Sequence, residues 1–269
     1  LKIVFTGSSV MRLKEENPEL NNIVKSYNLR GFSFREFLNL KTGNHFRPYT
    51  LDEILRNHER IVKDILPKVS PLSFFQDYLH HGFYPFFQEQ RNYSENLLKT
   101  MNMVTEVDIL LIKQIELKYL TKIKKLFYLL ALEGNKAPNV SWLAQEIETS
   151  RATVMNYIKY LADARLTNMI YPKGCEFPKK PSKVMMHNTN LMYAIYPIAV
   201  KRQDVMETFF VNTMWKDHNV NQGAKDDFYL VDGSLKFKIC NANDFEKKKF
   251  RQDTIYARYN TEVGKDNLI

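Results

Sequence analysis

The segment VSWLAQEIETSRATVMNYIKYLADARLTNMIYPKG, residues 140–174, carries the strongest fold signal in the chain. A short apolar stretch, VSWLAQEI, has Ser141 as its predicted N-cap and is followed by the turn ETS. In the longer stretch that comes next, apolar residues recur at helical spacing, namely Val154, Ile158, Leu161 and Leu166. The closing TNMIYPKG predicts a strand that leads into a wing. With the amphipathic helix predicted for TKIKKLFYLLALEG, which ends at Gly134, these elements predict a winged helix-turn-helix.

The second helix of this motif is the candidate for contact with nucleic acid. It would present four polar side chains outward, namely Arg151, Thr153, Asn156 and Lys159. These residue types contact phosphates and base edges in DNA complexes, so we predict binding to double-stranded DNA. The alternative is a winged helix that only packs between domains, because its second helix is only modestly basic.

The composition sets broad limits on the function. The 269 residues predict two or three domains, and an apolar fraction of 44% is enough for real cores. A formal net charge of +9 allows a polyanionic partner but does not require one. Cys175 and Cys240 cannot form a disulfide framework or a Cys-based zinc site, which predicts a reducing, cytoplasmic location. No apolar run approaches the length of about 18 residues that a membrane span needs, so we expect no membrane partner.

The C-terminal part contains the residues predicted to form a nuclease-like site. KVMMHNTNLMYAIY predicts a strand, a turn and a helix, and DVMETFFVNTMWKDH predicts a helix that carries Glu207. KDDFYLVDG and SLKFKIC predict a hairpin with Asp232 in its turn, and DFEKKKFRQDTIYARY predicts a further helix. A helix glutamate followed by a hairpin aspartate is how a two-carboxylate magnesium nuclease site is assembled. Lys238, however, stands where the second strand should supply a carboxylate, and its ammonium would repel a metal. We therefore expect a degenerate site without bound metal.

The N-terminal stretch LKIVFTGSS, residues 1–9, predicts a buried strand that ends in a small polar loop. Ligands of open α/β sheets bind beyond the carboxyl ends of the strands, so this loop is placed to contact a phosphate or a catalytic water. The alternative is a plain turn made of good N-cap residues. The sequence does not supply sheet neighbours for this strand, and it lacks the phosphate-binding pattern G-x-x-x-x-G-K-[ST].

Helix signals continue between this strand and the winged helix. Two capping boxes predict helix starts, namely Ser33 with Glu36 and Thr50 with Glu53. A later helix breaks at Gly82 and Pro85. The whole series runs from TGSS through GFSFREFL, GFYPFF and the winged helix to ETFFVN and DFYLVDG. It resembles prokaryotic ATPases of the AAA superfamily that carry a winged helix and a C-terminal restriction-nuclease-like domain of unknown function. This resemblance covers essentially the whole chain.

The resemblance implies a multidomain fold with α/β and all-α parts. The expected domains are a remnant of the ATPase α/β core with the sensor strand (1–50), a helical lid (51–120), the winged helix-turn-helix (121–174) and a degenerate nuclease-like α/β domain (175–269). By the same resemblance, Thr6 and Ser8 would sense the phosphate of a nucleotide, and Gly82 and Pro85 would lie near its adenine.

The resemblance also implies a function. Full-length members of the family would use ATP and Mg²⁺, couple ATP to a DNA or protein partner, and form homo-oligomers. Because this chain lacks the phosphate-binding loop, we expect no cofactor and no ATP hydrolysis by the chain alone. It is either part of a longer ATPase or a decayed copy. The alternatives are a DNA-binding module without catalysis and an active metal-dependent nuclease.

Overall fold

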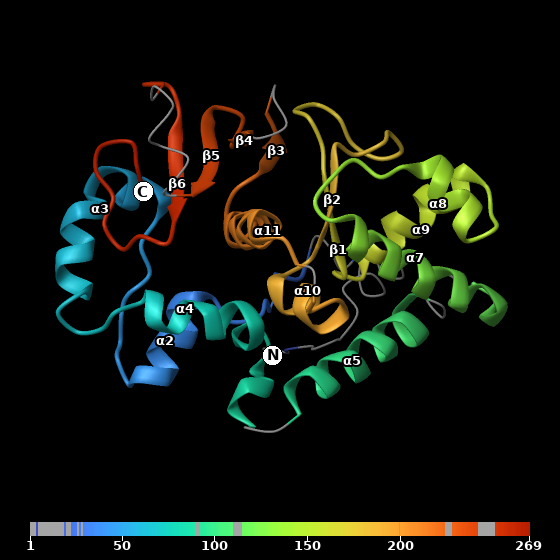
Figure 1. Ribbon diagram of the computed structural model, residues 1–269, viewed down its shortest axis with the longest axis horizontal. Coiled ribbons are helices and arrows are strands. Elements are labelled where there is room, and N and C mark those ends of the chain that lie inside the picture. The colour runs from blue at the N-terminus through green and yellow to red at the C-terminus, as the bar shows by residue number, and fades with distance from the viewer. Residues whose placement is uncertain are drawn as a thin grey trace.

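The computed structural model describes residues 29–89, 92–109, 115–198, 200–223, 228–241 and 251–269, and before them residues 4, 19, 23–25 and 27. Within these residues the fold is mixed α/β, with nine α-helices, a two-stranded sheet and a four-stranded sheet (Figure 1). Most of the predicted sensor strand, with Thr6 and Ser8, lies outside the described residues. Val4 is described, is 87% exposed and belongs to no strand, so burial is not seen at that position.

The first two helices begin at the predicted capping boxes. α2 (Phe34–Thr42) starts after Ser33, whose backbone N–H donates to Glu36 Oε2 at 2.8 Å. α3 (Leu51–Ile65) starts after Thr50 in the same way, with Glu53 Oε2 as acceptor. Each box satisfies backbone groups that the first helical turn leaves unpaired, which is why a four-residue pattern predicts these helix starts.

The predicted break at Gly82 and Pro85 is confirmed. α4 (Leu72–Asp77) runs into a π-helical turn, η2 (Tyr78–Gly82), and Pro85 opens the short 3₁₀ helix η3 (Pro85–Gln88). A Cβ atom at Gly82 would lie 2.3 Å from Cδ2 of the Tyr78 ring, so only glycine allows this close packing. α5 (Tyr93–Met103) follows, with a second π-helical turn, η4 (Val104–Ile109), and a 3₁₀ turn, η5 (Leu117–Tyr119).

The helices and the strand predicted over residues 121–174 are present. α7 (Leu120–Glu133) ends at Gly134, which has a φ of +74°, and is followed by α8 (Val140–Glu146), α9 (Arg151–Asp163) and β1 (Thr167–Ile170). The apolar residues predicted to face inward, Val154, Ile158, Leu161 and Leu166, are all buried. One detail is wrong: the N-cap of α8 is Asn139 rather than Ser141, because the Asn139 side chain accepts the Trp142 N–H at 3.2 Å.

β1 pairs antiparallel with β2 (Lys183–Met186), and two helices follow, α10 (Thr189–Ile195) and α11 (Arg202–Met214). The second sheet has the order β3 (Val220–Gln222), β4 (Phe228–Val231), β5 (Leu235–Asn241) and β6 (Ile255–Tyr259). The predicted hairpin is the antiparallel β4–β5 pair.

The helix predicted for DFEKKKFRQDTIYARY is wrong over Ile255–Tyr259, which form β6 and pair in parallel with β5. This short run of aliphatic and aromatic residues suits a strand, and the open edge of β5 supplies its partner. The rest of that stretch before residue 251 lies outside the described residues.

Backbone contacts link the end of β1 to β3. The Gln222 N–H donates to Tyr171 O at 2.8 Å, and Pro172 forms a parallel bridge with Gln222. Figure 1 shows the strands of both sheets in one row, with α10 and α11 below them. Buried apolar side chains from α2 to β5 form one continuous core, so the parts on either side of residue 174 share an interior. In the described part of the chain, no helix combines the length and the apolar character needed to span a membrane.

Candidate functional site

The first candidate site is the solvent-facing side of α9. Its N-cap Ser150 accepts the Thr153 N–H at 3.1 Å, and the two hydroxyl oxygens lie 2.8 Å apart, so Thr153 takes part in the cap. Arg151 and Asn156 are exposed. Lys159 is partly buried and forms an ion pair with Asp163 one turn later. Of the four predicted contact residues, Arg151 and Asn156 are therefore the two best placed to meet a partner.

The loop between β1 and β2, residues 171–182, begins with the end of the predicted wing and adds two lysines, Lys179 and Lys180, that were not predicted as contact residues. Figure 1 shows it projecting beyond the ends of the two strands. Lys173 Nζ donates to Gly233 O at 3.2 Å, while Lys179 and Lys180 are exposed near its tip. The run PKKPSK was the available sequence signal, since lysines in a projecting loop commonly contact phosphates.

The second candidate site surrounds Glu207, which the sequence analysis placed in a nuclease-like centre. Glu207 is 6% exposed on α11, and its Oε2 lies 2.8 Å from Lys183 Nζ, which comes from β2. The Tyr229 hydroxyl donates to the same oxygen at 2.6 Å, and Gln203 Nε2 donates to Oε1 at 3.1 Å. Lys183 and Tyr229 were not predicted as site residues; the local signal was a lysine directly before the apolar run VMM.

In this cluster, burial and the neighbouring charges shift the pKa values of the Tyr229 hydroxyl and of Asp204. Burial, and then the charge of Glu207, raise the pKa of the Tyr229 hydroxyl well above its usual value, so it stays protonated and donates to the carboxylate. Burial and the nearby Glu207 also raise the pKa of Asp204. Lys183 thus places an ammonium, instead of a metal ion, against the carboxylate of Glu207.

Asp232, the second predicted carboxylate, lies in different surroundings. It follows β4 in a left-handed conformation with a φ of +49°. Its Oδ1 accepts the Asn219 N–H at 2.9 Å, and its Oδ2 lies 2.6 Å from His218 Nδ1. Asp232 is thus bonded to His218 and Asn219, whereas Glu207 is bonded to Lys183, Tyr229 and Gln203.

Lys238 lies 5.1 Å from the centre of the Phe228 ring, which it contacts through a cation–π interaction. Over the residues that the structure describes, no group of three or more His, Cys, Asp or Glu side chains is arranged to hold a metal ion.

Gly82 and Pro85 flank a segment that α10 holds firmly. Asn190 is 1% exposed; its Oδ1 accepts the Phe83 N–H at 2.8 Å, and its Nδ2 donates to Tyr78 O at 3.0 Å and to Leu79 O at 2.8 Å. The π-helical turn η2 leaves such carbonyls outside the regular α-helical pattern, and Asn190 satisfies them. The turn predicted to lie near a nucleotide is thus fixed in place from the side of α10.

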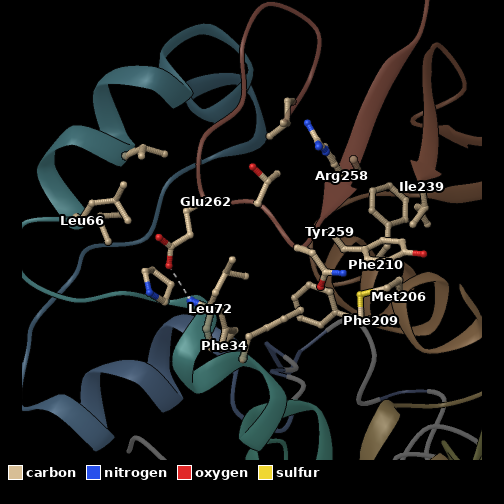
Figure 2. Close-up of a pocket in the computed structure, with 18 residues that line it drawn as sticks. Phe34, Leu66, Leu72, Met206, Phe209, Phe210, Ile239, Arg258, Tyr259 and Glu262 are labelled. Atoms are coloured by element: carbon tan, nitrogen blue, oxygen red, sulfur yellow. Dashed lines mark hydrogen bonds between the residues drawn. The ribbon is translucent and has the colours of Figure 1, made fainter. Parts of the chain in front are cut away.

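A third candidate is an apolar groove of about 310 Å³ between α3 and β6 (Figure 2). Leu66, Leu72 and Phe209 are among the apolar side chains that line it. Glu262 points toward the start of α4, where its Oε1 accepts the Leu72 N–H at 3.1 Å. The groove offers apolar contact rather than acid–base chemistry.

Comparison with known proteins adds two similarities. Residues 73–196 match a domain of unknown function, DUF8612. The chain is 28% identical over 178 residues to the uncharacterized protein MJ1637 of Methanocaldococcus jannaschii, an alignment that covers 64% of this chain and 37% of that protein. No solved structure matches the chain. The DUF8612 segment begins in α4 and ends just after α10, so it contains both ends of the contact between η2 and Asn190.

Proposed function

We propose that this chain binds double-stranded DNA through a winged helix formed by α7, α8, α9, β1 and β2, within an architecture of the AAA-type ATP-binding kind. The observation that carries the proposal is the exposure of Arg151 and Asn156 on α9, whose opposite face is buried. A second helix that is anchored by an apolar face and open on its polar face can enter a major groove. The exposed Lys179 and Lys180 of the β1–β2 loop would add phosphate contacts.

In this proposal the C-terminal sheet has a structural role and does not cleave DNA. Its order, a helix, three antiparallel strands and a last strand parallel to β5, is compatible with the restriction-nuclease-like domain that the sequence resembles. The carboxylate that would bind magnesium, Glu207, already has Lys183 as its counter-ion. We therefore assign this part a structural role, with ATP and Mg²⁺ as ligands of the wider architecture rather than of this sheet.

Binding can be tested by fluorescence anisotropy on a labelled duplex over a series of salt concentrations. We expect Arg151→Gln to weaken binding by about three- to tenfold and to lower the salt slope by about one. Lys159→Gln should have a smaller effect, because Lys159 is already paired with Asp163. Lys63→Gln is the matched control: it removes the same charge from an exposed position on α3.

Two results would contradict the proposal. One is the absence of salt-sensitive duplex binding by the unaltered chain. The other is an equal loss of affinity in the Arg151→Gln and Lys63→Gln variants, which would show that net charge, rather than the α9 surface, drives the binding. Either result would favour a winged helix that only packs within the protein.

A further inference from the structure

A cavity of about 310 Å³ lies where α5 approaches the ends of α9 and β2. Leu97 and Met101 of α5 and Leu166 form apolar walls, and Phe83 adds an aromatic ring. Three basic residues, Arg30, Arg165 and His187, line the same cavity. Among its described lining residues none is acidic. A mostly apolar cavity with a few basic groups is the usual form of a small-molecule site.

Arg30 is held at the cavity by its neighbours. Its guanidinium donates to Trp215 O, at the end of α11, and lies within 3.5 Å of Asn212 O. The next residues pack closely on Phe83: the Phe32 N–H donates to Phe83 O at 2.8 Å, and a Cβ at Gly31 would lie 2.4 Å from the Phe83 ring. Because the backbone around it is fixed, Arg30 is already in place before any ligand arrives.

Arg165 occupies a position that glycine usually fills. It follows the end of α9 with a φ of +58°, and the next residue, Leu166, donates its N–H back to Leu161 O at 2.9 Å. This is the geometry of a helix C-cap, where a left-handed backbone is strained for a residue with a side chain and favours glycine. This position is nevertheless occupied by an arginine, and the Arg165 side chain lines the cavity.

His187 is the third basic residue that lines the cavity. Its Nδ1 lies 3.0 Å from Asn168 Oδ1. Burial, and then the charges of Arg165 and Arg30, lower the pKa of His187 to about 3, so the ring is neutral near pH 7. The two guanidiniums also repel each other. Asp217, whose negative charge raises the pKa of Arg30, does not line the cavity. An anion at this end of the cavity would be attracted by both guanidiniums.

We propose that this cavity binds a small organic anion, with its carboxylate or phosphate group between Arg30 and Arg165 and its apolar body against Leu97 and Met101. Gly82 and Pro85, the positions that the sequence resemblance links to a nucleotide, do not line the cavity themselves, whereas Phe83 and Tyr84 between them do. The site is also separate from the DNA-binding face proposed on α9, so the two can be tested independently.

Phenyl phosphate is a suitable probe because it joins an aromatic body to a phosphate. By isothermal titration calorimetry we expect it to bind at least about tenfold more tightly than inorganic phosphate or benzyl alcohol, each of which supplies only half of the recognition. Arg165→Asn, which tolerates a positive φ, should weaken binding by about tenfold or more. Thr100→Met, which fills space in the cavity wall, should do the same without removing a charge.

Lys63→Gln, on the exposed surface of α3, controls for the loss of one positive charge and should bind phenyl phosphate like the unaltered chain. The proposal is overturned if phenyl phosphate binds no more tightly than inorganic phosphate, or if Thr100→Met leaves its affinity unchanged. If Arg165→Asn fails to fold, as judged by circular dichroism, the Thr100→Met comparison alone decides.

Discussion

Lys183 and Glu207 meet in the interior of the protein, with Lys183 Nζ 2.8 Å from Glu207 Oε2 and both side chains less than a tenth exposed. Lys183 belongs to β2, which pairs with β1, whereas Glu207 belongs to α11, which packs beneath the second sheet. The ion pair therefore joins the two halves of the fold at a point closed to water. Both charges lose their hydration there, so breaking the pair and replacing it should have very different costs.

Replacing Lys183 alone should be severe. Lys183→Met leaves Glu207 buried and without its counter-ion, and we expect a loss of about 3–5 kcal/mol in the free energy of unfolding. The double variant Lys183→Met with Glu207→Leu should recover most of that loss, because it removes both buried charges together. Urea denaturation of the two single variants and the double variant measures the coupling. Strictly additive effects would show that the two residues do not act as a pair.

The same ion pair argues against metal-dependent DNA cleavage. With Lys183 against Glu207, and Asp232 bonded elsewhere, we expect no magnesium-dependent nicking of plasmid DNA by the purified chain. Agarose electrophoresis with and without Mg²⁺ tests this. Cleavage that disappears in both Glu207→Ala and Asp232→Ala would overturn the expectation and make the chain a nuclease.

Local signals explain what could be predicted from the sequence. The capping box of Ser33 and Glu36 and the glycine stop at Gly134 involve neighbouring residues, so a few letters suffice to predict them. β6 was misread because its strand character depends on pairing with β5, more than a dozen residues earlier in the chain. Propensity alone does not reveal such a partner.

In the candidate sites, too, features that depend on neighbouring residues could be predicted, whereas contacts between distant segments could not. α9 and its exposed polar face follow from helical periodicity, which can be read along one segment. The partners of Glu207 cannot be read in this way, because Lys183 and Tyr229 are brought to it from separate strands by the tertiary fold. The sequence therefore predicted Glu207 on a helix but not its hydrogen-bond partners, and its predicted pairing with Asp232 stays a prediction.

The hydrogen bonds of Asp232 with His218 and Asn219 should make the free energy of unfolding depend on pH. Hydrogen bonds from His218 and from Asn219 hold the pKa of the Asp232 carboxyl below its usual value of 3.8. A lowered pKa in the folded state means that the stabilisation is present above the unfolded pKa and is lost as the pH falls through the folded value. Asp232→Asn keeps a residue that tolerates a positive φ but removes the charge.

We expect Asp232→Asn to lower the urea midpoint at about pH 7, and the difference from the unaltered chain to be smaller at about pH 3, below the usual carboxyl pKa. The effect should stay below about 1 kcal/mol, because the pair is nearly half exposed on the aspartate side and solvent screens it. A difference of constant size at both pH values would assign the effect to the turn geometry instead of the charge.

The absence of the phosphate-binding pattern leads to a prediction about nucleotide binding. The sequence contains no G-x-x-x-x-G-K-[ST], whose backbone N–H groups and lysine cradle the phosphates of ATP in proteins that use it. We expect isothermal titration calorimetry to show no tight Mg-ATP binding to the 269-residue chain, and phosphate-release assays to show no hydrolysis. Submicromolar binding would mean that other residues of this chain hold the triphosphate.

Asn190 should be one of the most sensitive positions in the fold. Its amide nitrogen donates to Tyr78 O and Leu79 O, while its oxygen accepts from Phe83 N and from the Tyr93 hydroxyl. Asn190→Asp keeps the shape but turns the donor into a second oxygen, which would face two carbonyls inside the protein. We expect a loss of about 3 kcal/mol or more in the free energy of unfolding, since buried polar groups without partners cost about 1–3 kcal/mol each.

The matched control for this variant is Asn102→Asp, the same chemical change at an exposed position of α5, which should alter stability by less than about 0.5 kcal/mol. Hydrogen exchange adds a local readout: if Asn190 holds the π-helical turn, Asn190→Asp should speed exchange of the Phe83 amide more than that of amides in α7. Equal stability losses in the two aspartate variants would show that α10 does not anchor this turn, and that η2 owes its shape to ring packing around Gly82 alone.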